Sequence, residues 1–187
     1  SLSEVLQQHP EFLGAKTSAT GDLPVLIKLI DAAKDLSVQV HPDDAYAQQY
    51  EHEPNGKTEM WYILEAEPEA SLIYGFSKPM QPEQLDTCLK ENTILSYLQK
   101  IPVKKGDVFL IPAGTVHAIG AGIVLAEIQQ RSNLTYRLYD YNRTDATGKK
   151  RPLHIEKAKA VIQFSASQPP KTKQPMQQKD GYQVQCL

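Results

Sequence analysis

Little in this sequence could cross-link the chain or anchor it in a membrane. Its 187 residues include two cysteines, Cys88 and Cys186, which are too few for a disulfide framework. The longest apolar run, from Val25 to Ile30, is interrupted by Lys28 and is far shorter than the roughly 20 residues that span a bilayer. No secretory signal is recognisable. We therefore expect a cytoplasmic protein without a membrane span.

An excess of charge of either sign is also missing. Twenty Lys and Arg residues stand against 22 Asp and Glu residues, which leaves a net charge of −2. Such a balance gives no reason to expect nucleic acid or an acidic membrane surface as a partner. With 41% hydrophobic residues, the chain can build one packed domain and part of a second. The oligomeric state stays open.

Short apolar or alternating stretches, separated by turn residues, dominate the chain. They predict a mainly β fold, an antiparallel sandwich or barrel. Residues 81–100 show a helical pattern between strands, and residues 153–162 show another. From residue 168 the composition changes to QPPKTKQPMQQK, which is typical of a linker, and the final GYQVQCL resembles the start of a strand. We expect one barrel over residues 1–167, with a helical insertion near 81–100, and a linker with the start of a second, truncated barrel over 168–187.

The most specific pattern is GDVFLIPAGTVH, from Gly106 to His117. Gly106 permits a tight turn before a strand, Pro112 ends that strand, and Gly114 permits a second turn. The spacing resembles the second conserved motif of the cupin superfamily. This resemblance implies a cupin, or jelly-roll, barrel in which His117 points inward. A surface histidine after a β-turn is the alternative, and the five-point spacing disfavours it.

Partners for His117 are expected on earlier strands. Gln39 and His41 are two residues apart and share one strand face, although taken alone they could be ordinary polar residues of a solvated strand. Glu59 begins the strand in GKTEMWYIL. Two imidazoles, a carboxylate and an amide oxygen would suit a catalytic zinc site. Asp43 and Asp44 lie nearer to His41, but they follow Pro42 and resemble helix-capping residues.

Four stretches together resemble the type I mannose-6-phosphate isomerases, or phosphomannose isomerases, in their short bacterial form. They are LSVQVHPDDAYA, GKTEMWYIL, PAGTVHAIGAG and EIQQRSNLTYRLYDYNR, in this order. The resemblance implies an aldose–ketose isomerase that interconverts mannose 6-phosphate and fructose 6-phosphate through a cis-enediol. It implies one Zn²⁺ per chain, held by Gln39, His41, Glu59 and His117. It also implies that the active-site arginine is Arg137 and that the lysine beside the glutamate ligand is Lys57.

Catalysis is accordingly assigned to Arg137, Lys57 and Glu127, and substrate binding to Ser37, Lys57 and Arg137. The alternation of LTYRLYD places Arg137 on the less apolar face of its strand, where an inward guanidinium would need an anion. The general base stays open, with Glu127 and Asp140 as the carboxylate candidates.

The chain departs from the family pattern in two respects. Family members extend beyond both ends of this chain and continue past Leu187 into a smaller second cupin barrel, so we expect a fragment that carries the metal site. The cupin motif usually has Asn where this chain has Ala121. Two other classes remain as alternatives, an iron-dependent cupin oxygenase and a metal-free sugar-binding cupin. Gln39 disfavours the oxygenase, because a histidine is usual there, and the full ligand set with Arg137 disfavours the sugar-binding cupin.

Overall fold

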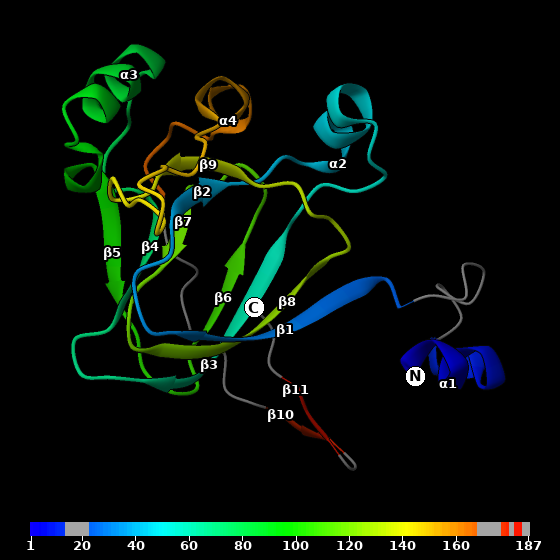
Figure 1. The fold of residues 1–187 in the computed structure, drawn as a ribbon. Coiled ribbons are helices and arrows are strands. Elements are labelled where there is room, and N and C mark those ends of the chain that lie inside the picture. Colours follow the sequence, from blue (N-terminus) through cyan, green and yellow to red (C-terminus); the bar gives the residue numbers. More distant parts are fainter. Residues whose placement is uncertain (14–22, 168–176, 180–181, 185–187) are drawn as a thin grey trace.

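Two antiparallel sheets that face each other form the centre of the computed structural model, which describes residues 1–13, 23–167, 177–179 and 182–184 (Figure 1). Strands follow the order β1-β8-β3-β6 in the first sheet and β5-β4-β7-β2-β9 in the second. The strands are β1 Val25–Ala32, β2 Val38–Val40, β3 Glu59–Ala66, β4 Ser71–Phe76, β5 Leu98–Pro102, β6 Val108–Ile111, β7 His117–Ile119, β8 Ile123–Gln130 and β9 Tyr136–Tyr139. The mainly β barrel predicted from the sequence is confirmed.

Strict alternation in β8 explains how one barrel holds both a core and a polar site. Every second residue of this strand is buried, beginning with Ile123 and Leu125 at one end and continuing with Glu127 and Gln129. The same inward face is therefore apolar in its first half and polar in its second. The neighbouring strand β3 is polar at the matching end, where Glu59 pairs with Gln129 in the ladder.

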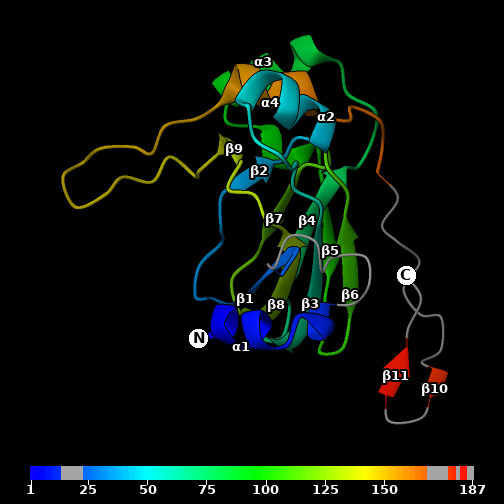
Figure 2. The ribbon, with the colours of Figure 1, turned by 90° about the vertical axis from the view of Figure 1, so that its right-hand side faces the viewer.

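Apart from the apolar half of the barrel interior, a separate apolar cluster covers the outer face of the five-stranded sheet. Helices α2 (Asp44–Tyr46), α3 (Pro82–Lys90) and α4 (Ile155–Val161) lie together at that end of the molecule (Figures 1 and 2). Leu138 of β9 is buried in this cluster together with Leu85 of α3 and Ala158 of α4. Helix α1 (Leu2–Gln8) lies away from these helices, and the short helical turns are η1 Pro10–Leu13, η2 Ala47–Glu51 and η3 Ile94–Ser96. No helix in the described part of the chain is both long and apolar enough to cross a bilayer.

The helical insertion is shorter than its sequence pattern predicts. Helix α3 ends at Lys90, and Asn92 then adopts a left-handed conformation with φ of 57°. The prediction of helix up to residue 100 is wrong for the last part, because Leu98 begins β5 and pairs with Phe76 of β4. Pairing with an available sheet edge outweighs a local apolar pattern that helix and strand can share.

The carboxyl-terminal stretch contains a small antiparallel pair of strands. The strand expected in GYQVQCL is present as β11 (Tyr182–Val184), and it pairs with β10 (Gln177–Lys179). Strand β10 lies inside the stretch predicted as a linker, and its partner β11 belongs to the same chain. Residues 168–176 lie outside the described residues. The division into two domains stays a prediction.

The assignment of core residues predicts that the same substitution changes the free energy of unfolding very differently at two leucines. Leu125 is fully buried in the barrel interior, whereas Leu29 of the edge strand β1 is 76% exposed. We expect Leu125→Ala to lower the free energy of unfolding by about 2–5 kcal/mol, because it removes packed atoms and leaves a cavity. Leu29→Ala, the matched control, should change it by about 0.5 kcal/mol or less. Urea denaturation measures both, and equal losses at the two positions would contradict this inside–outside assignment.

Candidate metal centre and active site

Three metal-ligating side chains converge in the polar half of the barrel. His41, Glu59 and His117 are each 1% exposed, and one ligand atom from each lies within 4.8 Å of the others. Glu59 is central, because its Oε1 lies 3.1 Å from His41 Nε2 and its Oε2 lies 3.7 Å from His117 Nε2. The structure brings these three predicted residues together, and they could hold a metal ion.

Strand register brings the three groups together. Gln39 of β2 pairs directly with His117 of β7, so their side chains lie on the same face of the five-stranded sheet. His41 follows β2, and its carbonyl oxygen accepts a hydrogen bond of 2.9 Å from the Gly114 amide of the cupin-like turn. Glu59 opens β3 in the facing sheet. The site is therefore built across both sheets.

Gly56 lets the loop before Glu59 pack against the chain that follows His41. A Cβ at residue 56 would lie 2.3 Å from the carbonyl carbon of Asp43, so only glycine allows this approach. The contact aligns the next residue, whose amide donates a hydrogen bond of 2.9 Å to Pro42 O. Asp43 itself caps α2 through a hydrogen bond from the Tyr46 amide, as its sequence context predicted.

The hydrogen bonding of the cluster fits a metal ion. His117 Nδ1 lies 2.9 Å from the carbonyl oxygen of Thr115, which can only accept, so Nδ1 carries the proton and Nε2 is free to act as a ligand. Both ring nitrogens of His41 and Oε1 of Glu59 are buried without a well-formed hydrogen bond. Buried polar atoms are rarely left in this state, and a divalent cation would satisfy one ring nitrogen of His41 and the Glu59 oxygen.

Gln39 reaches the cluster with its amide nitrogen rather than its oxygen. Its Nε2 lies 3.4 Å from His117 Nε2. The predicted ligand atom is the amide oxygen, and a half-turn about the last side-chain bond exchanges the two atoms. Gln39 is thus in place for the predicted role, which stays a prediction.

Electrostatics keep the cluster in the protonation state that binds metal. Burial lowers the pKa of His41 to about 4, against the opposing effect of Glu59, and burial also lowers the pKa of His117. Burial by itself would raise the pKa of Glu59, but the close approach of His41 and the charges of His117 and Lys57 hold it below its usual value. Two neutral imidazoles and one carboxylate are the forms that coordinate a cation.

The predicted cations lie beside this cluster. Lys57 is 5% exposed, its Nζ lies 3.1 Å from Glu59 Oε1, and it also reaches Thr135 Oγ1 at 3.4 Å. Lys57 is therefore not a solvated loop lysine. Arg137 of β9 pairs with Gln39 of β2, and its Nε donates a hydrogen bond of 3.4 Å to Ser37 Oγ. Lys57 therefore contacts Glu59 directly. Arg137 lies beside Gln39 in the sheet, and Ser37 contacts Arg137.

Glu127 is joined to the cluster through a residue that the sequence reasoning missed. Trp61 Nε1 lies 3.1 Å from both Glu59 Oε2 and Glu127 Oε2. Lys28 Nζ donates a hydrogen bond of 2.9 Å to Glu127 Oε1 and also contacts Gln129 Oε1. Lys28 was treated only as an interruption of an apolar run. Its strand parity, the same as that of the buried Ala32, could have placed it on the inward face.

Asp140, the other candidate base, lies elsewhere. Its carboxylate is held by Arg143 and Arg151 and contributes no atom to the His41–Glu59–His117 cluster. Its strand parity explains the separation, because Asp140 falls on the opposite face of the chain from Arg137. The expectation that Asp140 could serve as the base is therefore corrected, and Glu127 remains the carboxylate candidate.

Comparison with known proteins agrees with this geometry. Residues 1–74 match the model of the type I phosphomannose isomerase catalytic domain. The chain is 46% identical over 164 residues to the mannose-6-phosphate isomerase ManA of Bacillus subtilis, an alignment that covers 87% of this chain and 51% of that protein. By sequence, this chain is similar to the type I phosphomannose isomerases over most of its length.

Further members of the family match over a similar stretch. A mannose-6-phosphate isomerase of Streptococcus mutans is 46% identical over 161 residues, covering 86% of this chain and 50% of its own length. The crystal structure of the mannose 6-phosphate isomerase from Bacillus subtilis superimposes with a TM-score of 0.82 at 35% identity, covering 97% of this chain and 57% of that chain. This chain spans about half the length of the curated relatives it matches.

The buried histidines predict how the metal-free protein responds to acid. The folded-state pKa of His41 lies below its usual 6.5, so the unfolded chain binds the extra proton first and stability is lost as pH falls from about 6.5 towards 4. The depressed pKa of Glu59 acts in the same direction below its usual value of 4.5. His41 alone should contribute on the order of 3 kcal/mol to this loss.

Urea denaturation of the chelator-treated chain near pH 7 and near pH 4.5 measures this dependence. His9→Gln is the control, because His9 is exposed and should leave the pH dependence unchanged. The same stability at both pH values would contradict the neutral, buried state of the two cluster histidines.

Proposed function

We propose that this chain carries the catalytic barrel of a zinc-dependent mannose-6-phosphate isomerase. The observation that supports it most is the buried cluster of His41, Glu59 and His117, which has two cations, Lys57 and Arg137, beside it. A site that combines a metal centre with fixed positive charge suits an anionic sugar whose carbonyl must be polarised. Relatives that bear the name mannose-6-phosphate isomerase match across most of the chain.

Zinc is the proposed ion, one per chain, held by Gln39, His41, Glu59 and His117. Two imidazoles, one carboxylate and one amide, with no thiolate, suit a catalytic rather than a structural zinc site. When bound, the ion supplies Lewis-acid polarisation of the sugar carbonyl and charge stabilisation for the enediolate. The Thr115 carbonyl would fix the ring of His117 in the ligand orientation.

The side chains around the ion have separate proposed tasks. Arg137 remains cationic and offers a planar fork of donors, so it can hold either the phosphate or the enediolate, and Lys57 adds a point charge. Ser37 adds a hydroxyl beside Arg137. Glu127 is the proposed group that moves a proton between C1 and C2 of the open-chain sugar through the cis-enediol. Trp61 fixes one of its oxygens and Lys28 the other, which orients the carboxylate.

Three further assignments belong to this proposal. We place the metal-binding domain at residues 1–167, with 168–187 as linker and start of a second barrel, on the change in composition alone. The expected partner is a small sugar phosphate. The cytoplasm is the proposed compartment, which agrees with the buried free thiol of Cys88.

Metal content tests the ligand set directly. We expect the purified protein to contain about one zinc per chain, because the four groups form one site. His41→Ala and His117→Ala should each lose most of it, since each removes an imidazole that the other ligands cannot replace. Inductively coupled plasma mass spectrometry of the dialysed variants measures this. His9→Ala, at an exposed histidine, should keep its zinc, and retention of full zinc by both cluster variants would refute the site.

Arg137 tests the isomerase reaction. We expect Arg137→Ala to keep its zinc content and to lose most of the turnover of mannose 6-phosphate, because the guanidinium contacts substrate rather than metal. Fructose 6-phosphate formation in a coupled assay gives the rate, and metal analysis of the same sample gives the control. An Arg137→Ala variant with turnover close to the parent would overturn the assignment and leave Lys57 as the next cation to test.

A further inference from the structure

The segment between β9 and α4 leaves the barrel as a long loop (Figure 2). Its returning end contacts Arg137. Asp140, directly after β9, stands at the start of this loop, and Arg151 and Pro152 stand at its end. The Asp140 side chain is only 7% exposed. A buried carboxylate at the base of an exposed loop needs strong partners, and it has them.

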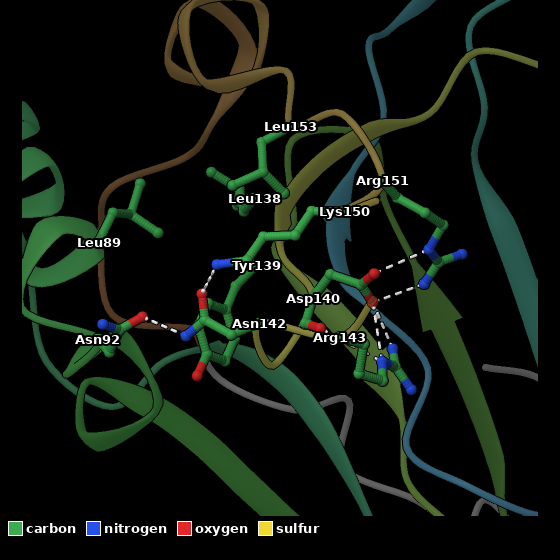
Figure 3. A pocket seen from close by; sticks show the side chains of 10 residues that line it. All are labelled: Leu89, Asn92, Leu138, Tyr139, Asp140, Asn142, Arg143, Lys150, Arg151 and Leu153. Carbon is green, nitrogen blue, oxygen red and sulfur yellow. Dashed lines mark hydrogen bonds and ion pairs between the residues drawn. The ribbon is translucent and has the colours of Figure 1, made fainter. Parts of the chain in front are cut away.

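Two arginines of the loop hold this carboxylate (Figure 3). Arg151 approaches both oxygens, with Nε 2.8 Å from Oδ2 and Nη2 2.5 Å from Oδ1. Arg143 donates to Oδ1 from Nε at 3.2 Å and also contacts Oδ1 through Nη2. Two-pronged guanidinium–carboxylate pairing fixes orientation as well as distance. Asp140 therefore fastens the returning end of the loop to the end of β9.

That returning end is what holds Arg137. The carbonyl oxygen of Pro152, next to Arg151, accepts a hydrogen bond of 2.8 Å from Arg137 Nη1. His154 then pairs with the Arg137 backbone in both directions, accepting from its amide at 3.1 Å and donating to its carbonyl at 2.8 Å. The contact of Arg137 with Ser37 is longer, at 3.4 Å. Of the two hydrogen bonds that the guanidinium donates here, the one to the Pro152 carbonyl is the shorter.

The cavity that Asp140, Arg143 and Arg151 help to line does not carry a separate ligand site. It has a volume of about 80 Å³, and several polar side chains of its lining bond to one another. Lys150 Nζ donates to Asn142 Oδ1 at 2.9 Å, and Asn142 Nδ2 donates to Asn92 Oδ1 at 2.7 Å (Figure 3). A small cavity whose polar side chains bond mainly to one another is better explained as structural support than as a binding site.

We infer that Asp140 is a positioning residue, which acts through Arg151 and the Pro152 carbonyl to fix the orientation of the Arg137 guanidinium, whose strand pairs with the predicted ligand Gln39. This inference rests on the proposed isomerase function. An arginine side chain has several rotatable bonds, and fixing it before substrate arrives removes an ordering cost from the catalytic step. Asp140 also offsets the repulsion among three neighbouring guanidiniums, those of Arg137, Arg143 and Arg151.

Kinetics of loop variants test this inference. We expect Arg151→Ala to lower kcat roughly tenfold, since a small misplacement of a catalytic group is costly, and to leave zinc content unchanged. The double variant Arg137→Lys/Arg151→Ala should have a kcat less than twofold below that of Arg137→Lys alone, because the effect of Arg151 passes through Arg137. Lys150→Ala is the matched control, a neighbouring loop cation with no contact to Asp140, and it should keep the parent kcat. Asp140→Asn should reproduce Arg151→Ala if it folds.

A spectroscopic readout keeps the test independent of turnover. In a ¹H–¹⁵N correlation spectrum, the Arg137 Nε–H signal is identified by its loss in Arg137→Lys. We expect it to shift and broaden in Arg151→Ala and to stay in place in Lys150→Ala. An unchanged signal together with parent-like kcat in Arg151→Ala would overturn the positioning role, as would an undiminished effect in the Arg137→Lys background. A parent protein without isomerase activity would refute the proposed function instead, and the signal alone would then decide the positioning.

Discussion

The rest of the site depends on one buried negative charge, the carboxylate of Glu59. A charge removed from water costs far more than a neutral group, and it persists only where other groups compensate it. Here Lys57 supplies a cation, Trp61 an N–H donor, and His41 and His117 the remaining neighbours. These residues come from two strands, β3 and β7, and from the two loops that hold His41 and Lys57. Any shift in register among β2, β3 and β7 would leave the carboxylate uncompensated, so the site and the fold are mutually constrained.

The barrel interior is apolar at one end of its strands and polar at the other, and the polar end holds Glu59. On β8, Leu125 packs in the apolar half, while Glu127 two residues later faces the site. The apolar half supplies rigidity, and the polar half holds the ligands on strands rather than on loops. Arg137 combines both kinds of support, because its backbone lies in β9 and its guanidinium is held by a carbonyl of the returning loop.

The site was more predictable from the sequence than its surroundings. Gln39 and His41 follow from strand alternation, and His117 follows from a motif whose glycines and proline are needed for its turns. Trp61 and Lys28 were missed, because a tryptophan and a lysine within apolar strands are ordinary by composition. Asp140 was a candidate base beside Glu127, although its parity places it on the opposite strand face from Arg137. Leu98 was expected in a helix, because its apolar spacing suits a helix as well as a strand.

The sequence by itself determined what depends on local spacing: a mainly β fold, the shared strand face of Gln39 and His41, and the turn before His117. Such features follow from backbone geometry within a few residues. Only the tertiary structure decided which distant groups meet. It joined Glu127 to Glu59 through Trp61, brought Lys28 onto Glu127, and placed Asp140 with Arg151 instead of the metal cluster. Contacts across sheets depend on how strands pair and how the barrel closes, and no spacing within a single strand encodes that.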